Sequence, residues 1–338
     1  MCDISQVADF LFEPDVNPDL IKANKVAVIG YGSQGHAHAQ NLRDNGVQVV
    51  IGLYPGSKSR AQAEADGFPT HDTCEAVQRA DVVMLCTPDV PMAQIYREDV
   101  APFLRSGMTL LFAHGFNIVY GTIAPPSGID VAMVSPKGPG PGLRAEFMAG
   151  KGLPALVAVH QDATGQAEAL ALSYAWGIGS ARAGILRTTF REETETDLFG
   201  EQAVLCGGIP ALIEAGVQTL IDAGYTPEVA YFECLHETRL IVELLYRGGL
   251  THMNKRISDT AEWGGYLAGK RLVTDQTRAD MKAILAEIQS GQFAHGWIAE
   301  NEAGLPHMQA FRQQTPNLPT EQVGRRVRRT LPIIEEED

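Results

Sequence analysis

Four acidic residues at helical spacing are the residues in this sequence best suited to chemistry. Asp197 and Glu201 are four positions apart, and Glu233 and Glu237 repeat that spacing. In an α-helix, residues four apart lie on one face with their Cβ atoms roughly 5–6 Å apart. We therefore expect each pair to direct two carboxylates toward one place.

The sequence around these acids is strongly apolar. After Glu201, apolar residues fall on nearly every side of the expected helix, and residues 229–245 have the same character. Such helices are normally buried, so we expect these acids in an apolar environment. Buried carboxylates that repel one another must find partners, bind cations or take up protons. Two Mg²⁺ ions would balance four carboxylates, and oxygen ligands suit Mg²⁺ better than zinc.

The alternative is that the acids form surface ion pairs with basic residues, of which Arg239, Lys255 and Arg256 are candidates. For one isolated acid pair, that explanation is the more common one. Two pairs within apolar helices favour a metal site.

Composition is that of an ordinary soluble protein of two domains. The chain has 338 residues, of which 45% are apolar, enough for two separate cores. The formal net charge of −14 argues against a nucleic-acid partner. The basic stretch 325–329 precedes an acidic end at 335–338, and we interpret it as a solvated helix face or frayed tail.

The cysteines and the start of the chain indicate a cytoplasmic protein. No CxxC spacing joins the five cysteines, so reduced thiols are expected. Residues 1–5 lack a secretory pattern, and no uninterrupted run of about 18 apolar residues occurs. We therefore expect neither export nor membrane insertion. The cysteines are Cys2, Cys74, Cys86, Cys206 and Cys234.

A glycine-rich turn early in the chain predicts a dinucleotide site. The β-branched run 25–29 leads into Gly30-Tyr31-Gly32-Ser33-Gln34-Gly35 and then a helical stretch. This strand, turn and helix order lets a pyrophosphate approach the helix N-terminus. A second strand is expected at 47–52. No acid follows it to bind a ribose 2′-hydroxyl, whereas Ser57, Lys58, Ser59 and Arg60 could bind a 2′-phosphate.

That composition favours NADP(H) over NAD(H). The alternative is that the serines merely open a solvated helix.

Further apolar strands predict a doubly wound α/β sheet. They are expected at 81–86, 109–113, 131–134, 155–159 and 181–186, and helical stretches between them indicate parallel pairing. Ligands bind beyond the carboxyl ends of such strands. This rule selects the loops 87–89, 114–117 and 135–140. His114 and Lys137 could each be ordinary loop residues, but their shared edge favours a functional role.

Near residue 188 the sequence pattern changes from alternating strands and helices to long helices. We therefore predict a Rossmann-type nucleotide-binding domain at 1–188 and an all-helical domain for metal, substrate and dimerisation at 189–334.

At this point the motifs can be compared with a known family: the chain resembles class I (short) ketol-acid reductoisomerases along nearly its whole length. The resemblance is carried by the glycine-rich loop and by five further segments. These segments are 113–117, 135–140, 195–202, 232–237 and 257–262.

The resemblance implies an NADPH-dependent enzyme with two Mg²⁺ ions per site. It would convert 2-acetolactate and 2-aceto-2-hydroxybutyrate in valine and isoleucine biosynthesis. Asp197 would bridge the metals, with Glu201 on one side and Glu233 and Glu237 on the other. In the short class the last two acids come from a neighbouring subunit, so an intertwined homodimer is implied. The helical domain of this family is knotted.

The expected site residues divide by role. Two metals would hold the substrate hydroxyl and ketone as Lewis acids while an alkyl group migrates, and NADPH would then reduce the new ketone. Glu201 or a metal-bound hydroxide is the candidate base, and His114 and Lys137 would orient water or substrate. Glu193 would support the ligands from an outer shell. Ser258 would bind the substrate carboxylate, unless it only caps a helix.

A set of residues is expected to contact the cofactor. Many relatives carry arginine where Tyr54 stands, and glutamine is frequent where Met92 stands, so both positions bear on cofactor selectivity. The expected contacts are Tyr31, Gly32, Ser33, Gln34, Tyr54, Ser57, Ser59, Asp89, Val90, Pro91, Met92 and Gly140.

Two other functional classes share parts of this pattern. A metal-free hydroxyacid dehydrogenase also joins a Rossmann domain to helices, but it has no need of four buried acids. A non-catalytic NADP-sensing protein would bind the nucleotide without oxidising it.

Overall fold

The structure is a computed structural model that describes residues 8–331. It divides into two compact units, residues 1–196 and 197–338, and the division falls within helix α9 (Phe190–Phe199). The change predicted at residue 188 precedes this division. Several features used above lie outside the described residues: Cys2, the N-terminal pattern at 1–5, the last residues of the predicted second domain at 332–334, and the acidic end.

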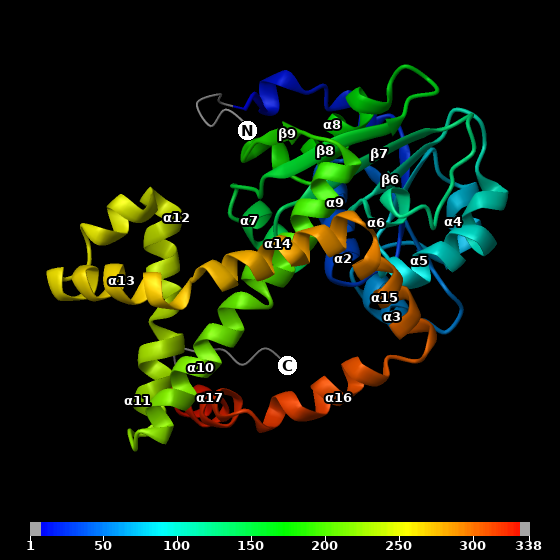
Figure 1. The fold of residues 1–338 in the computed structure, drawn as a ribbon. Helices are drawn as coiled ribbons and strands as arrows, with labels where there is room; N and C mark the ends of the chain where they lie inside the picture. Colours follow the sequence, from blue (N-terminus) through cyan, green and yellow to red (C-terminus); the bar gives the residue numbers. More distant parts are fainter. Residues whose placement is uncertain (1–7, 332–338) are drawn as a thin grey trace. The chain divides into compact units, whose positions relative to one another are not determined.

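The first unit is built on a mixed sheet of nine strands among the described residues (Figure 1). Their order across the sheet is β1-β9-β8-β7-β6-β5-β2-β3-β4. In chain order the strands are β1 Phe10–Leu11, β2 Lys25–Ile29, β3 Gln48–Leu53, β4 Thr70–Asp72, β5 Val82–Leu85, β6 Thr109–Phe112, β7 Asp130–Pro136, β8 Ala155–Gln161 and β9 Ile185–Arg187.

The expected α/β class and doubly wound arrangement are confirmed, with one correction to strand direction. Strands β4, β3, β2, β5, β6 and β7 are parallel to one another in this order, but β8 is antiparallel to β7. The connection from β7 returns the chain to the carboxyl end of that strand, where Pro136 pairs with Ala155. Strand β8 therefore starts at the edge where β7 ends. Strand β1 is likewise antiparallel to β9.

Alternation along each central strand divides the core between the two faces of the sheet. In β2, Val26 and Val28 belong to one buried cluster, whereas Ala27 and Ile29 belong to the other. Successive side chains of a strand point to opposite faces, so a strand buried on both sides is apolar throughout. The helices and helical turns of this unit are α1 Asp19–Lys22, α2 Ser33–Asp44, α3 Ser59–Ala65, α4 Thr73–Gln78, α5 Asp89–Ile95, η2 Tyr96–Val100, α6 Phe116–Val119, α7 Gly140–Met148 and α8 Ala167–Gly177.

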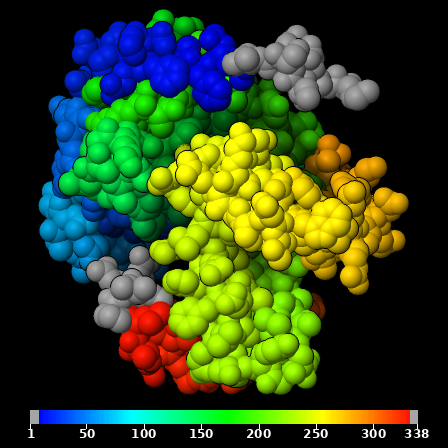
Figure 2. Space-filling view, turned by 90° about the vertical axis from the view of Figure 1, so that its left-hand side faces the viewer, coloured from blue at the N-terminus to red at the C-terminus, as the bar shows by residue number. Residues whose placement is uncertain are grey.

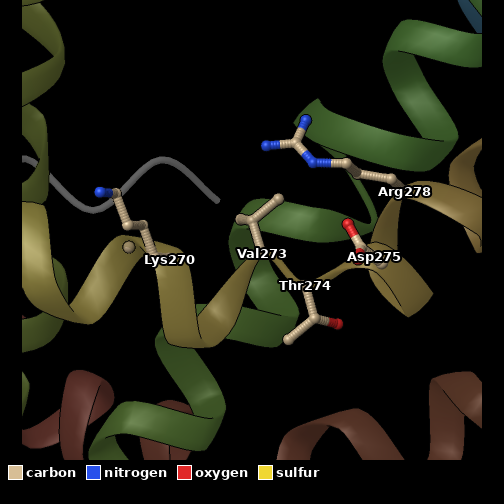
Figure 3. A pocket seen from close by; sticks show the side chains of 6 residues that line it. Lys270, Val273, Thr274, Asp275 and Arg278 are labelled. Carbon is tan, nitrogen blue, oxygen red and sulfur yellow. The ribbon is translucent and has the colours of Figure 1, made fainter.

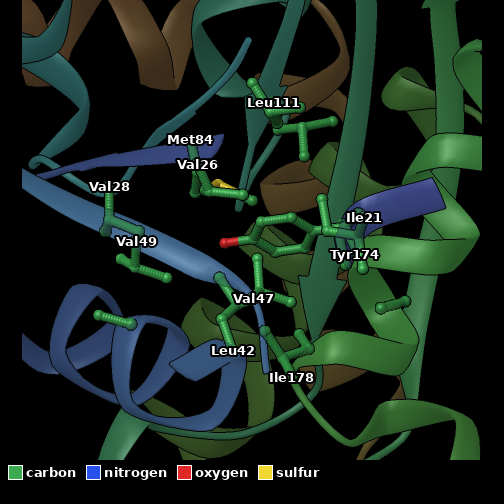
Figure 4. Close-up of a cluster of buried hydrophobic side chains, with 14 of the residues drawn as sticks. Ile21, Val26, Val28, Leu42, Val47, Val49, Met84, Leu111, Tyr174 and Ile178 are labelled. Carbon is green, nitrogen blue, oxygen red and sulfur yellow. The ribbon is translucent and has the colours of Figure 1, made fainter. Parts of the chain in front are cut away.

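Tyr174 of α8 lies within the cluster on one of these faces, among aliphatic side chains such as Leu42 and Val47 (Figure 4). Its ring is fully buried, and its hydroxyl lies 2.9 Å from Nδ1 of His38, which is also fully buried. A buried hydroxyl needs such a partner because an unpaired polar group in the core is costly.

The second unit is helical. Two of its segments are π-helical turns, η5 (Gly200–Leu205) and η6 (Phe232–His236). Helix α12 is interrupted at Gly249, whose φ of 71° lies in the left-handed region that glycine tolerates. The α-helices are α10 Gly208–Asp222, α11 Pro227–Tyr231, α12 Thr238–Asn254, α13 Asp259–Leu272, α14 Asp275–Gln289, α15 Gln292–Glu302, α16 Pro306–Gln314 and α17 Pro319–Thr330.

The helices that follow the acids are less buried in one chain than their composition predicts. Helix α12 has no buried residue, α10 has one, and the side chains of Tyr246, Leu250 and Trp263 are 85%, 70% and 67% exposed. The expectation that these apolar helices are buried is therefore wrong within the described chain. Among the described residues, one buried cluster of this unit is formed by Tyr231, Val323 and Val327.

One helical stretch, Phe190–Asp222, is long and apolar enough to cross a membrane by length and composition. Its most apolar 18-residue window has a mean hydropathy of 1.6, and 6% of that window is buried. A core helix of a soluble protein passes the same test, so one such stretch is weak evidence. Interrupting polar residues explain why no continuous apolar run is visible in the sequence.

Candidate active site

The glycine-rich turn adopts the geometry that a dinucleotide loop requires. Gly30 has φ of 97°, and its N–H donates to the carbonyl oxygen of Gly52 at the end of β3. A Cβ on Gly35 would lie 2.2 Å from the carbonyl oxygen of Gly30, whereas a Cβ on Gly32 would meet nothing within 4 Å. The turn is thus closed against the sheet and open above Gly32, where α2 begins. A helix of this length presents free N–H groups to an anion.

A second loop is tied to the first. The N–H of Gly140 donates to Ser33 Oγ at 3.3 Å, and Gln34 Nε2 donates to the carbonyl oxygen of Gly138 at 3.0 Å. A Cβ on Gly140 would lie 1.5 Å from the carbonyl oxygen of Ser33, so only glycine permits this approach. The structure thus brings together Ser33, Gln34 and Gly140, three of the expected cofactor contacts.

Two buried polar atoms at this edge fit a bound nucleotide. Gln34 Oε1 and Thr87 Oγ1 are buried without a hydrogen-bond partner among the described residues. Buried polar groups are nearly always paired in native proteins, so such atoms suggest a group that the protein chain does not itself supply. Both residues follow strands that end here, β2 and β5, so the site fits a nucleotide.

Other expected cofactor residues differ in their exposure. The ring of Tyr31 is buried, and its hydroxyl donates to Asp66 Oδ2 at 2.6 Å. Burial and this hydrogen bond raise the pKa of Tyr31 to about 12. The side chain of Tyr54 is 59% exposed. Met92 is 4% exposed, and its sulfur accepts from Asn117, so it is a core contact.

Asp89, Val90 and Pro91 form the first turn of α5, after β5. The side chains of Asp89 and Val90 are partly buried and Pro91 is exposed.

Arg60 has partners within its own unit at the end of β3. Its guanidinium lies 2.7 Å from Asp72 Oδ1, and it also donates to the carbonyl oxygen of Leu53 and to Thr70 Oγ1. Ser57 and Ser59 are half-buried beside it, and Lys58 is exposed. Arg60 is therefore less available for a 2′-phosphate than the sequence implies.

Glu193 is the centre of a hydrogen-bond network at the carboxyl edge of the sheet. It is fully buried on α9 and accepts from Ser135 Oγ at 2.7 Å and from Lys137 Nζ at 2.9 Å. His114 Nδ1 lies 3.1 Å from its other oxygen, which also accepts from the N–H of Gly115 at 3.2 Å. The predicted pair His114 and Lys137 thus meet at one carboxylate.

The charge of Glu193 is stabilised by these neighbours. Burial alone would raise its pKa, but the hydrogen bond from His114 and the charges of His114 and Lys137 outweigh burial and lower the pKa to about 2. The carboxylate is therefore ionised at neutral pH. A buried carboxylate with several donors is a rigid anchor, and it fixes the direction of the Lys137 ammonium.

Asp197 follows Glu193 one turn later on α9. The possible ligand atoms of His114, Glu193 and Asp197 lie within 4.8 Å of one another. Both oxygens of Glu193 already accept from protein donors, and the Lys137 ammonium beside it would repel a cation. Glu193 is therefore better suited to orient its neighbours than to bind a metal.

Glu201 departs from the regular spacing assumed from the sequence. It lies in the π-helical turn η5, where its carbonyl oxygen accepts from the N–H of Cys206, five residues later, at 2.8 Å. Each residue of a π-turn rotates less about the axis than in an α-helix, so the angle between the Asp197 and Glu201 side chains differs from the one that a regular α-helix gives. Single π-turns concentrate at functional sites.

Glu233 lies in the second π-turn, η6, in the same way. The N–H of Glu237 donates to the carbonyl oxygen of Phe232, also five residues away, at 3.0 Å. Glu201, Glu233 and Glu237 are all exposed. Within the described residues, the cluster of three possible metal ligands does not include them.

Ser258 caps helix α13. Its Oγ accepts from the N–H of Ala261 at 3.2 Å, and its side chain is exposed. The hydroxyl proton remains available to a substrate, because capping uses only an acceptor position.

A pocket of about 430 Å³ lies at the junction of α13 and α14, and none of the predicted site residues lines it (Figure 3). In Figure 3 Thr274 points to the opposite side of the chain from Val273, so the polar groups do not converge. Thr274 caps α14, and the pocket is a helix junction without a built ligand site. Its lining is Gly269, Lys270, Val273, Thr274, Asp275 and Arg278.

The fold and this site define a class: an oxidoreductase that joins a dinucleotide-binding sheet to a helical unit. Comparisons with known proteins agree. The family description "Acetohydroxy acid isomeroreductase, NADPH-binding domain" matches residues 20–184, and "Ketol-acid reductoisomerase, C-terminal domain" matches residues 190–333.

Among solved structures, an NADH-preferring ketol-acid reductoisomerase from an uncultured archaeon is 40% identical, with a TM-score of 0.94. The match covers 96% of this chain and 99% of that one. The chain belongs to the ketol-acid reductoisomerase family. It is an isomeroreductase of branched-chain amino-acid biosynthesis.

More distant structures share only the fold. A putative oxidoreductase from Jannaschia sp. CCS1 is 15% identical with a TM-score of 0.60, over 79% of this chain and 97% of that one. A semialdehyde dehydrogenase NAD-binding protein from Cupriavidus necator is 20% identical with a TM-score of 0.59, over 79% and 99%.

Proposed function

We propose that this isomeroreductase converts 2-acetolactate and 2-aceto-2-hydroxybutyrate to 2,3-dihydroxy-3-methyl acids, with NADPH as reductant and two Mg²⁺ ions per site. The observation that supports this most is the buried Glu193 network, which sets Lys137 and His114 one helical turn from Asp197. A simple hydroxyacid dehydrogenase has no use for an acid-bearing helix beside these groups.

The acidic side chains near this site offer oxygen atoms, which suit Mg²⁺. We assign Asp197 and Glu201 to the metals, together with Glu233 and Glu237 from a second copy of the chain. Bound Mg²⁺ would act as a Lewis acid toward the substrate oxygens.

The remaining chemistry belongs to the side chains. Glu193 holds the Lys137 ammonium as a proton donor toward an oxygen of the substrate. It also orients His114 through Nδ1, which leaves Nε2 to bind substrate or water. Ser258 binds the substrate carboxylate with its hydroxyl proton. Glu201 is the candidate base for the substrate hydroxyl.

The reductant is held by the two linked glycine loops. Gly32, Ser33 and Gln34 would contact the pyrophosphate, with Gly140 closing from the second loop. Asp89, Val90 and Pro91 would contact the nucleotide after β5. We propose that Ser57, Ser59 and Lys58 bind the 2′-phosphate, and that Tyr54 stacks on the adenine. When bound, the nicotinamide supplies the hydride.

We also propose that the active protein is an intertwined homodimer. The support is the apolar surface of the second unit, where Leu272 and Phe311 are also more than half exposed. Figure 2 shows the surface of this region of α12 and α13 in yellow. Exposed apolar patches of this kind mark interaction surfaces. A second copy would cover the faces that one chain leaves open, and would bring Glu233 and Glu237 to Asp197.

The cellular setting that we propose is the cytoplasm. Cys74, Cys86, Cys206 and Cys234 are free thiols, as a reducing compartment would leave them.

One spectrophotometric assay tests the reaction. Purified protein should oxidise NADPH when given 2-acetolactate and Mg²⁺, and EDTA should stop it. Activity that persists in EDTA would favour the metal-free dehydrogenase, and nucleotide binding without oxidation would favour a sensor. Asp197→Asn should lose Mg²⁺-dependent isomerisation, with Glu192→Gln on the exposed side of α9 as the control. Light scattering should give the mass of a dimer, and Tyr246→Glu should lower it.

A further inference from the structure

Strands β3 and β4 end side by side at the edge where the second strand of a dinucleotide fold meets the adenosine ribose. Leu53 of β3 pairs with Asp72 of β4 in a parallel ladder. In this fold class, the group after the second strand selects between a ribose hydroxyl and a 2′-phosphate. Here the segment after β3 carries Lys58 and Arg60, and the nearby acidic residue, Asp72, lies on the neighbouring strand β4.

Asp72 and Arg60 form the shortest ion pair at this edge, with Nη2 and Oδ1 2.7 Å apart. The same nitrogen lies 3.4 Å from the carbonyl oxygen of Leu53, and Nη1 lies 3.4 Å from Thr70 Oγ1. Thr70 in turn donates to Glu64 Oε1 at 2.6 Å. Three acceptors on β3 and β4 therefore hold the Arg60 guanidinium against the strand ends.

We propose that Asp72 is a specificity-determining residue: it sequesters Arg60 and so weakens the selection of NADPH over NADH. This inference rests on the nucleotide site proposed above. With Arg60 paired, Lys58 is the remaining cation of the segment, beside the hydroxyls of Ser57 and Ser59. Lys58 is exposed and its flexible ammonium lacks the bidentate fork of a guanidinium. The protein should therefore accept both nucleotides.

The pair can be broken without disturbing the local fold. Asp72 precedes α4 at its N-cap position, and asparagine is an equally good residue there. Asp72→Asn removes the charge that holds Arg60 and keeps the shape of the side chain. Glu75 offers a matched control, because it lies on α4, is 55% exposed and pairs with His71 instead of Arg60.

Binding of 2′,5′-ADP and 5′-ADP, measured by calorimetry, isolates the 2′-phosphate from catalysis and metals. We expect Asp72→Asn to raise the preference for 2′,5′-ADP about tenfold, because a freed guanidinium forms a charge-assisted hydrogen bond to phosphate. Glu75→Gln should change the preference less than about twofold, as expected for a screened surface charge. Arg60→Gln alone should also change it less than about twofold.

The double variant Arg60→Gln/Asp72→Asn should lose the gain of Asp72→Asn. The kcat/KM ratio for NADPH over NADH should move in the same direction.

Three results would overturn the inference. One is an unchanged preference in folded Asp72→Asn, and another is an equal gain in Glu75→Gln. The third is a tenfold loss in Arg60→Gln, which would show that Arg60 already binds the phosphate. If neither nucleotide binds the unmodified protein, the nucleotide site itself fails, and the role of Asp72 fails with it.

Discussion

Glu193→Gln is the substitution that tests the proposed site most directly. The change keeps the volume of the side chain and replaces one carboxylate oxygen by an NH₂ group. In one amide orientation the NH₂ faces the N–H of Gly115, and in the other it faces the ammonium of Lys137. Each orientation sets donor against donor, so no rotation of the amide satisfies the site.

The magnitude follows from these contacts. A buried donor that loses its acceptor costs about 1–3 kcal/mol, and hydrogen bonds to a charged group contribute more than neutral ones. The Lys137 side chain is 32% exposed, so solvent screening reduces its share. Together the loss should be about 2–4 kcal/mol, which corresponds to a Tm lower by roughly 5–15 °C for a unit of this size.

Calorimetry measures the Tm, and Glu192→Gln is the matched control. Glu192 is the preceding residue on α9, is exposed, and accepts from Thr188 Oγ1. Its substitution should shift Tm by no more than about 2 °C, as for most surface changes. Activity of Glu193→Gln should fall about a hundredfold, because Lys137 and His114 lose their orientation. If the Tm of Glu193→Gln equals that of the control Glu192→Gln, Glu193 does not anchor Lys137 and His114.

Two further predictions concern the first unit. Burial and then the charge of His36 lower the pKa of His38 to about 3, so the unfolded chain binds this proton near its ordinary value of 6.5 and the folded chain does not. Stability from neutral His38 is complete above pH 6.5 and is lost as pH falls toward 3. Between pH 7 and pH 5, the free energy of unfolding of the unmodified protein should therefore fall by about 2 kcal/mol more than that of His38→Gln, as measured by urea unfolding. Equal decreases in the two proteins would contradict this. Gly140→Ala should weaken 5′-ADP binding at least tenfold, because its Cβ would meet the Ser33 carbonyl, whereas Gly142→Ala, with ordinary contacts of 3.7 Å, should not.

The central strands were predictable because each one is specified locally. The run 25–29, its glycine turn and the following helix form one continuous signal, and β2 and α2 occupy those positions. Strands β1 and β4 have two and three residues, too few to show a period. The direction of β8 depends on where the chain returns after α7. Residues 155–159 contain no pattern that indicates the direction of this strand.

The acidic residues and the loops of the site were predictable from the sequence, but the hydrogen bonds that join them were not. The sequence places His114, Lys137 and Glu193 at strand ends and on the following helix, yet it does not show that they share one carboxylate. One donor to that carboxylate is a backbone N–H, that of Gly115, which carries no side-chain signal. The π-turns at Glu201 and Glu233 were missed because four-residue spacing was interpreted with α-helical geometry.

Helix α9 connects the carboxyl edge of the sheet to Asp197, the proposed metal ligand. Its first turns carry Glu193, which is fixed by donors from the loops after β6 and β7, so the helix is held to the carboxyl edge of the sheet. Asp197 follows one turn later on the same rigid backbone. The carboxylate of Glu193, which is positioned by the nucleotide-binding sheet, is thus followed one turn later by Asp197, which we propose as a Mg²⁺ ligand. Because a helix transmits position with little bending over one turn, loosening Glu193 should displace Asp197 as well. The Mg²⁺ dependence of Glu193→Gln should therefore weaken along with its stability, which a role confined to packing would not produce.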